Sequence, residues 1–173
     1  MAKTLMAEIL DLWERTGALF AQATDDDLEI LIVGLTAEQL QACLSYLFVE
    51  GRQMTPVYRL VSTGETITFS TLTPEALITV LTEPPFEISA MFTVNLPALP
   101  AIAYYVDDEG CFSVACAPGR EWNAMTLLAL FDLLHRIHGI APQAEIAPDP
   151  YIFSDEEQHT FTEALKDYLD ASN

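Results

Sequence analysis

Two apolar runs on either side of an acidic turn decide the fold of this chain: Ala101-Ile-Ala-Tyr-Tyr-Val106, Asp107-Asp-Glu-Gly110 and Cys111-Phe-Ser-Val-Ala-Cys-Ala117. Each run has the length of a strand, and the turn between them has the residues of a hairpin connection. The stretch therefore predicts an antiparallel hairpin. Just beyond it, residues 123–138 carry leucine and phenylalanine on more than one face, which predicts a helix covered on two sides.

Outward from this hairpin, helix and strand patterns interleave. Further helices are expected at residues 4–22, 36–49, 73–83 and 154–171. Further strands are expected at residues 28–33, 56–61, 66–70 and 88–96. Capping boxes open two of the helices, Thr36-Ala-Glu-Gln39 and Ser154-Asp-Glu-Glu157. Because this order lacks regular βαβ spacing, we predict an α+β fold, with a mostly antiparallel sheet of about five to six strands and helices packed against it.

Length and composition predict a single domain over residues 1–173 with a full core, since 51% of the residues are hydrophobic. Several prolines make residues 140–153 an extended connector that leads to the last helix. The start of the chain does not have the pattern of a signal peptide, and no apolar run approaches the ~18 residues that a membrane span needs. Three cysteines give no disulfide framework, so we expect a cytoplasmic protein.

Acidic side chains greatly outnumber basic ones in this chain. It has 26 acidic and 7 basic side chains, and no lysine or arginine occurs between Arg59 and Arg120. Nucleic acids and anionic membranes are therefore not expected as partners, because both require clustered basic residues. A basic protein or peptide is expected instead, although acidity that serves only solubility is an alternative. The candidate contact residues are the carboxylates of two turns, Asp25, Asp26, Asp27, Asp107, Asp108 and Glu109.

No catalytic motif is present, and we expect no catalytic residue, no cofactor and no metal. His135 and His138 share a helix face and could in principle hold a metal, but their place in the last turn is better explained by a favourable interaction with the helix dipole. A small-molecule-binding domain or enzyme, with a pocket between sheet and helices, is the alternative to a protein-binding module. Its pocket-lining candidates are Tyr104, Tyr105, Trp122 and His135, although aromatic residues in strands more often belong to the core.

One stretch of the chain resembles a known family through the order of its elements, which are an Ala-Tyr strand, an acidic turn, a partner strand and a Leu/Phe-rich helix. From Ala101 to His138 the chain is similar to the C-terminal half of small acidic proteins with the type III secretion chaperone-like fold. Those proteins are α+β, often dimeric, and bind segments of other proteins. The resemblance implies a protein-binding module of chaperone, adaptor or toxin-neutralising type, with a homodimer as a further expectation. The helix at 36–49 has no counterpart in it, so it assigns no site residues.

Overall fold

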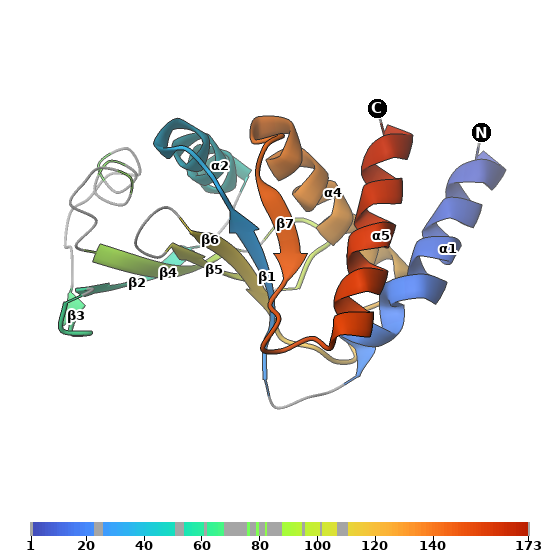
Figure 1. Cartoon of the computed structure of the whole chain (residues 1–173), viewed down its shortest axis with the longest axis horizontal. Coiled ribbons are helices and arrows are strands. Elements are labelled where there is room, and N and C mark those ends of the chain that lie inside the picture. The colour runs from blue at the N-terminus through green and yellow to red at the C-terminus, as the bar shows by residue number, and fades with distance from the viewer. Residues whose placement is uncertain are drawn as a thin grey trace.

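The computed structural model describes residues 2–22, 26–50, 54–60, 62–67, 76, 79, 82, 88–94, 96–100, 102–106 and 111–172. Of the side chains in the helices and strands, those of residues 2–6, 48–50, 54–56, 88 and 92 lie outside the description. The helices are α1 (Ala2–Ala21), α2 (Ala37–Glu50), α4 (Ala124–Ile140) and α5 (Asp155–Ser172). The strands are β1 (Leu28–Val33), β2 (Met54–Leu60), β3 (Thr66–Ile67), β4 (Ile88–Val94), β5 (Ile102–Val106), β6 (Phe112–Cys116) and β7 (Glu145–Pro148) (Figure 1).

The strands form one 7-stranded sheet in the order β3-β2-β4-β5-β6-β1-β7. Every neighbouring pair is antiparallel. This confirms the predicted α+β fold, with a strand count slightly above five to six. The additional strand is β7, which lies inside the segment interpreted as a connector. Proline is tolerated there because β7 is an edge strand and pairs on one side only, with Pro148 opposite Ile30.

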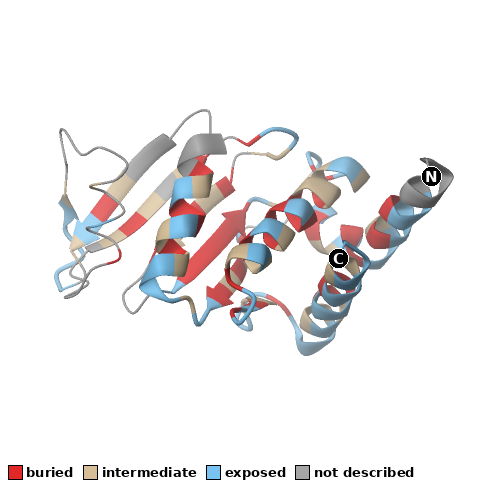
Figure 2. Ribbon diagram, turned by 90° about the horizontal axis from the view of Figure 1, so that it is seen from above, coloured by how far each residue is buried: buried red, intermediate tan, exposed pale blue. Residues whose placement is uncertain are grey.

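The helices cover one face of the sheet. α2 and α4 lie side by side on it, whereas α1 and α5 stand beyond the β7 edge and pack against α4 (Figure 1). The outer surfaces of α2 and α4 are exposed and their inner surfaces are buried against the strands (Figure 2). No helix of the described part is long and apolar enough to span a membrane.

A group of aromatic rings joins α1, α4 and α5. Phe20 lies with its ring centroid 4.8 Å from Trp122 and 6.2 Å from Phe161, and Phe161 lies 5.4 Å from Phe131. Phe20, Phe131 and Phe161 are fully buried. Three helices that are distant in sequence therefore share one compact contact, which fixes α1 and α5 on the side of α4.

The helix starts follow local sequence signals. Ser154 and Glu157 bond reciprocally, with Ser154 N–H donating to Glu157 Oε2 at 2.9 Å and Glu157 N–H donating to Ser154 Oγ at 3.4 Å. Thr36 and Gln39 do the same at 2.9 and 3.2 Å, so both predicted capping boxes are confirmed. At its other end, α4 runs two residues beyond the predicted range of 123–138, to Ile140, and its last turn is closed by Ala141 N–H donating to the Ile137 carbonyl.

Candidate functional site

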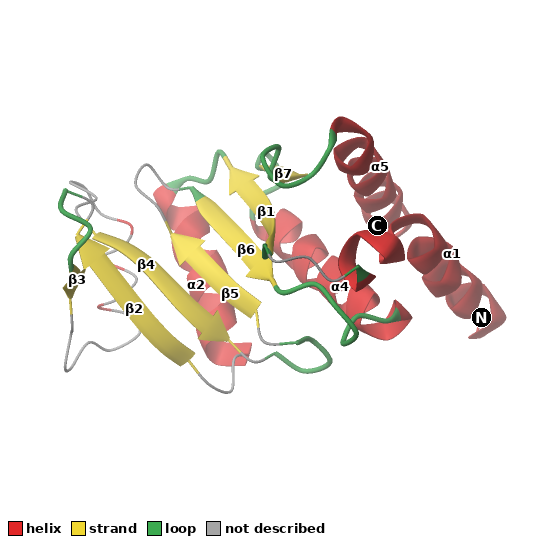
Figure 3. Ribbon diagram, turned by 90° about the horizontal axis from the view of Figure 1, so that it is seen from below, coloured by secondary structure: helices red, strands yellow, loops and turns green. Residues whose placement is uncertain are grey.

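The face of the sheet opposite α2 and α4 carries no helix in the part of the chain that the structure describes (Figure 3). Side chains alternate along a strand, so this face, which we call the open face, receives every second residue. In β1 the side chains of Leu28, Ile30 and Ile32 are buried toward the helices. The intervening Leu31 and Val33 point to the open face, and Val33 is 44% exposed.

The register aligns one row of side chains across six strands of the open face: Ala147, Leu31, Ser113, Tyr105, Met91 and Val57. The outward face of an antiparallel sheet is normally polar. In this row only Ser113 and the hydroxyl group of Tyr105 are polar. This row is therefore more apolar than the outward face of a sheet normally is, which is typical of a surface that meets another molecule.

A hollow interrupts the row at one end. It has a volume of about 240 Å³ and lies between Val57, Arg59, Ser89, Met91 and Tyr105. Arg59 is exposed and stands opposite Ser89 on the neighbouring strand. The hollow thus combines an apolar floor with one guanidinium group at its rim.

Carboxylates lie at the other end of the row, around β1 and β7. Glu29 on β1 accepts a hydrogen bond from the hydroxyl group of Ser113, and the exposed Glu145 stands opposite Val33. Burial raises the pKa of Tyr105, and the nearby charges of Asp27 and Glu29 raise it further, while Arg59 lowers it. Tyr105 therefore stays protonated between an acidic end and a basic end of the open face.

Four of the six predicted partner-binding carboxylates, Asp25, Asp107, Asp108 and Glu109, lie outside the described residues. Asp26 and Asp27 are exposed at the start of β1. Asp27 lies two residues before Glu29, and its charge raises the pKa of Tyr105. Sequence reasoning missed the apolar residues of this face, because their alignment depends on pairings between distant strands.

The four candidates for a pocket between sheet and helices lie in separate places. Tyr104 is fully buried beside Phe112, and its neighbour Tyr105 points to the opposite face of the sheet. Trp122 packs on Phe20 and donates its indole N–H to the Ala117 carbonyl at 2.9 Å. His135 is half-buried, with its ring edge toward Tyr168. Tyr104 and Trp122 thus fill the core, and the structure brings no two of the four together as a pocket lining.

Within the described residues, no group of three or more His, Cys, Asp or Glu side chains has a geometry that could hold a metal ion. Cys43 and Cys116 are buried, and burial raises the pKa of their thiols to about 11 and about 12. Cys111 is exposed. The two buried thiols therefore stay protonated at neutral pH and behave as small apolar side chains.

Comparison of the chain with protein-family models, with curated proteins and with solved structures gave no match.

Proposed function

We propose that the protein is a non-enzymatic binding module that holds a basic segment of a partner protein on its open face. The observation that carries this proposal is the apolar row across six strands, which runs toward the carboxylates of Asp27, Glu29 and Glu145 at one end. An occupant with apolar side chains and lysine or arginine residues complements both features. Such a module belongs to the chaperone, adaptor or toxin-neutralising type.

The apolar row supplies affinity and the charges supply orientation. Removing apolar surface from water stabilises a complex by roughly 25 cal/mol per Å². The carboxylates near β1 attract the basic side chains of the partner, whereas Arg59 at the far end of the row repels them. The partner segment is therefore expected to lie along the row with its basic end toward β7.

The net charge of the chain argues for this occupant over a second copy of the chain. Two copies with a formal charge of −19 each repel one another, whereas a basic partner is attracted and associates faster at low salt. The similarity of residues 101–138 to type III secretion chaperone-like proteins, which bind segments of other proteins, is a second support for the proposal.

The test uses two matched leucine variants. Leu31→Arg places a charge on the open face near its acidic end, on the strand next to the β7 edge, whereas Leu10→Arg makes the same change at a leucine of α1 that is 49% exposed. A synthetic peptide of alternating lysine and leucine serves as the defined probe. We expect the wild-type chain and Leu10→Arg to bind it equally, and Leu31→Arg to bind it at least tenfold more weakly, by titration calorimetry at low salt.

Two further results decide the proposal. In a nuclear magnetic resonance titration, the peptide should shift the amide signals of β1, β5 and β6, and the affinity should fall as salt rises. Equal binding by Leu31→Arg and Leu10→Arg, or affinity that is independent of salt, would overturn it. A dimer in light scattering that Leu31→Arg dissociates would replace the basic partner with a second copy.

A further inference from the structure

A cleft is lined by residues of α1, α4 and α5. It has a volume of about 300 Å³. That volume is at the small end of the range for ligand pockets, so a molecule of a few carbon atoms is the fitting size. None of its lining residues belongs to the sheet, and α1 and α5 stand beyond the β7 edge (Figure 1).

The floor of the cleft is apolar and open. Ile9 and Leu12 from α1 meet Leu128 from α4 there. α5 contributes two alanines, Ala164 and Ala171, whose short side chains leave the space unfilled. An aliphatic chain of a ligand would therefore find carbon surface on three sides.

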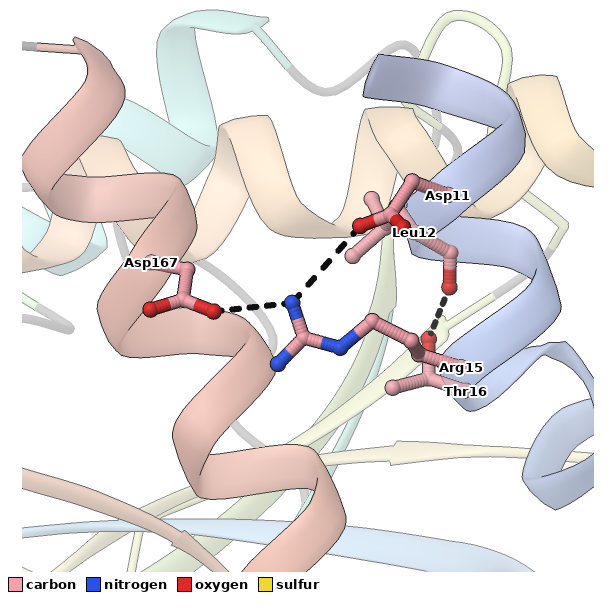
Figure 4. A network of polar contacts seen from close by, with 5 residues as sticks. All are labelled: Asp11, Leu12, Arg15, Thr16 and Asp167. Carbon is pink, nitrogen blue, oxygen red and sulfur yellow. Dashed lines mark hydrogen bonds and ion pairs between the residues drawn. The ribbon is translucent and has the colours of Figure 1, made fainter. Parts of the chain in front are cut away.

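The rim of the cleft is acidic, with three carboxylates and one guanidinium group. Arg15 donates to Asp167 on α5 at 2.8 Å, and its distance to Asp11, one turn earlier on α1, is 3.7 Å (Figure 4). Arg15 is therefore engaged mainly by Asp167. Glu8 lies three residues before Asp11, and no hydrogen bond or ion pair joins Glu8 to any other residue whose side chain is described.

One wall of the cleft is an aromatic ring held in place. Tyr168 donates its hydroxyl hydrogen to Asp132 at 2.5 Å, and Phe131 meets its ring at a centroid distance of 5.6 Å and an interplanar angle of 83°. Burial and Asp132 raise the pKa of Tyr168, so the hydroxyl group stays protonated. A fixed phenol ring beside carboxylates is a favourable contact for a cation.

We infer that this cleft binds a small aliphatic amine. The ammonium group lies between Glu8 and Asp11 beside the Tyr168 ring, and the hydrocarbon chain lies on Leu12, Leu128 and Ala164. Arg15 keeps its hydrogen bond to Asp167. This site is separate from the open face, so the test of amine binding does not depend on the proposed function.

The probe is n-hexylammonium chloride, titrated into the whole chain and followed by nuclear magnetic resonance. We expect a dissociation constant on the order of 0.1–1 mM, with shifted amides in α1 and α5 around the cleft. Methylammonium, which lacks the chain, and 1-hexanol, which lacks the charge, should each bind at least about tenfold more weakly.

Two isosteric variants with the same change in net charge localise the ammonium group. Asp11→Asn should weaken hexylammonium binding about fivefold to tenfold. Glu14→Gln, at an exposed position of α1 outside the cleft, should change it less than twofold. Circular dichroism melting verifies that both variants fold. The absence of saturable shifts up to 10 mM hexylammonium, shifts located elsewhere, or equal weakening by both variants would overturn the inference.

Discussion

Arg15 on α1 donates a hydrogen bond to Asp167 on α5, 2.8 Å away and 152 residues later in the chain. The chain has only 7 basic residues against 26 acidic ones, so the carboxylates of α1 and α5 face one another with little neutralisation. A single guanidinium group between Asp11 and Asp167 reduces that repulsion where the two helices meet (Figure 4). The contact therefore matters more here than it would on a surface of balanced charge.

Replacing this arginine should destabilise the fold in a salt-dependent way. We expect Arg15→Gln to lower the free energy of unfolding by about 1 kcal/mol at low salt, at the upper end for an exposed ion pair. The loss should shrink in 0.5 M salt, because screening removes the repulsion between α1 and α5. Urea unfolding at two salt concentrations measures it. Arg120→Gln, an exposed arginine before α4, is the control, and an equal loss in both variants would contradict the prediction.

Two helical glycines should respond oppositely to alanine. A Cβ atom at Gly17 would lie 2.5 Å from the Trp13 ring, whereas one at Gly139 meets nothing within 4 Å. We expect Gly139→Ala to raise the free energy of unfolding by about 0.5–1 kcal/mol through helix propensity. Gly17→Ala should lower it, because the indole must move, and should change the tryptophan fluorescence. A stabilised Gly17→Ala with unchanged fluorescence would show that Trp13 does not depend on this glycine.

Truncation of Phe161 should lower the free energy of unfolding more than truncation at most other positions in the chain. Its ring contacts both Phe20 and Phe131, so truncation opens a cavity between α1, α4 and α5. We expect Phe161→Ala to cost about 3–5 kcal/mol of the free energy of unfolding. The exposed neighbour Thr162→Ala should change it by less than about 0.5 kcal/mol. Urea unfolding distinguishes the two, and a loss below about 1 kcal/mol for Phe161→Ala would be inconsistent with this packing.

Stability should fall as the solution becomes alkaline. Burial raises the pKa of Cys116 from 9.0 to about 12, so above pH 9 the unfolded chain releases a proton that the folded chain retains. This contribution is fully present below pH 9 and is lost as pH rises through 12. The slope approaches about 1.4 kcal/mol per pH unit.

The measurement is the urea midpoint between pH 8 and 10.5 in the presence of a reductant. Cys116→Ala should be less stable at pH 7, because the thiol also contacts the Leu28 carbonyl at 3.7 Å, but it should show a flatter dependence on pH. Cys111→Ala removes an exposed thiol and should leave the slope unchanged. A slope in Cys116→Ala equal to that of the wild type would assign the effect to other groups.

Local signals in the sequence predicted most of the fold. The capping boxes at Thr36 and Ser154 correctly predicted where two helices begin, because their hydrogen bonds join residues only three apart in the sequence. A third box, between Asn123 and Thr126, was missed, although an asparagine before an apolar helix is a recognisable cap. The helix expected at residues 123–138 runs two residues further, to Ile140, and ends before Ala141-Pro142, because proline disfavours a helical conformation in the residue before it.

The candidate site could not be predicted in the same way. Alternation along a strand already implied that Tyr104 and Tyr105 point to opposite faces. Packing between segments that are distant in the sequence decides which of the two faces the helices cover. The same long-range pairing aligns Leu31 with Ala147 and Ser113. The short strand β7 was missed for a related reason. Its prolines resemble those of a connector, and only the pairing with β1 makes it a strand.

The position of β1 between β6 and β7 has a consequence for synthesis of the protein. β1 leaves the ribosome before both of its partner strands, and the second of them, β7, ends at Pro148. At ~5–20 residues per second, the interval from Leu28 to Pro148 lasts about 6 to 24 s. During that time the run Leu28–Val33 has no complete pairing, and two later strands must arrive on its opposite edges. Among the strands of the sheet, β1 therefore waits longest for its last partner and is exposed longest to aggregation and to cellular folding factors.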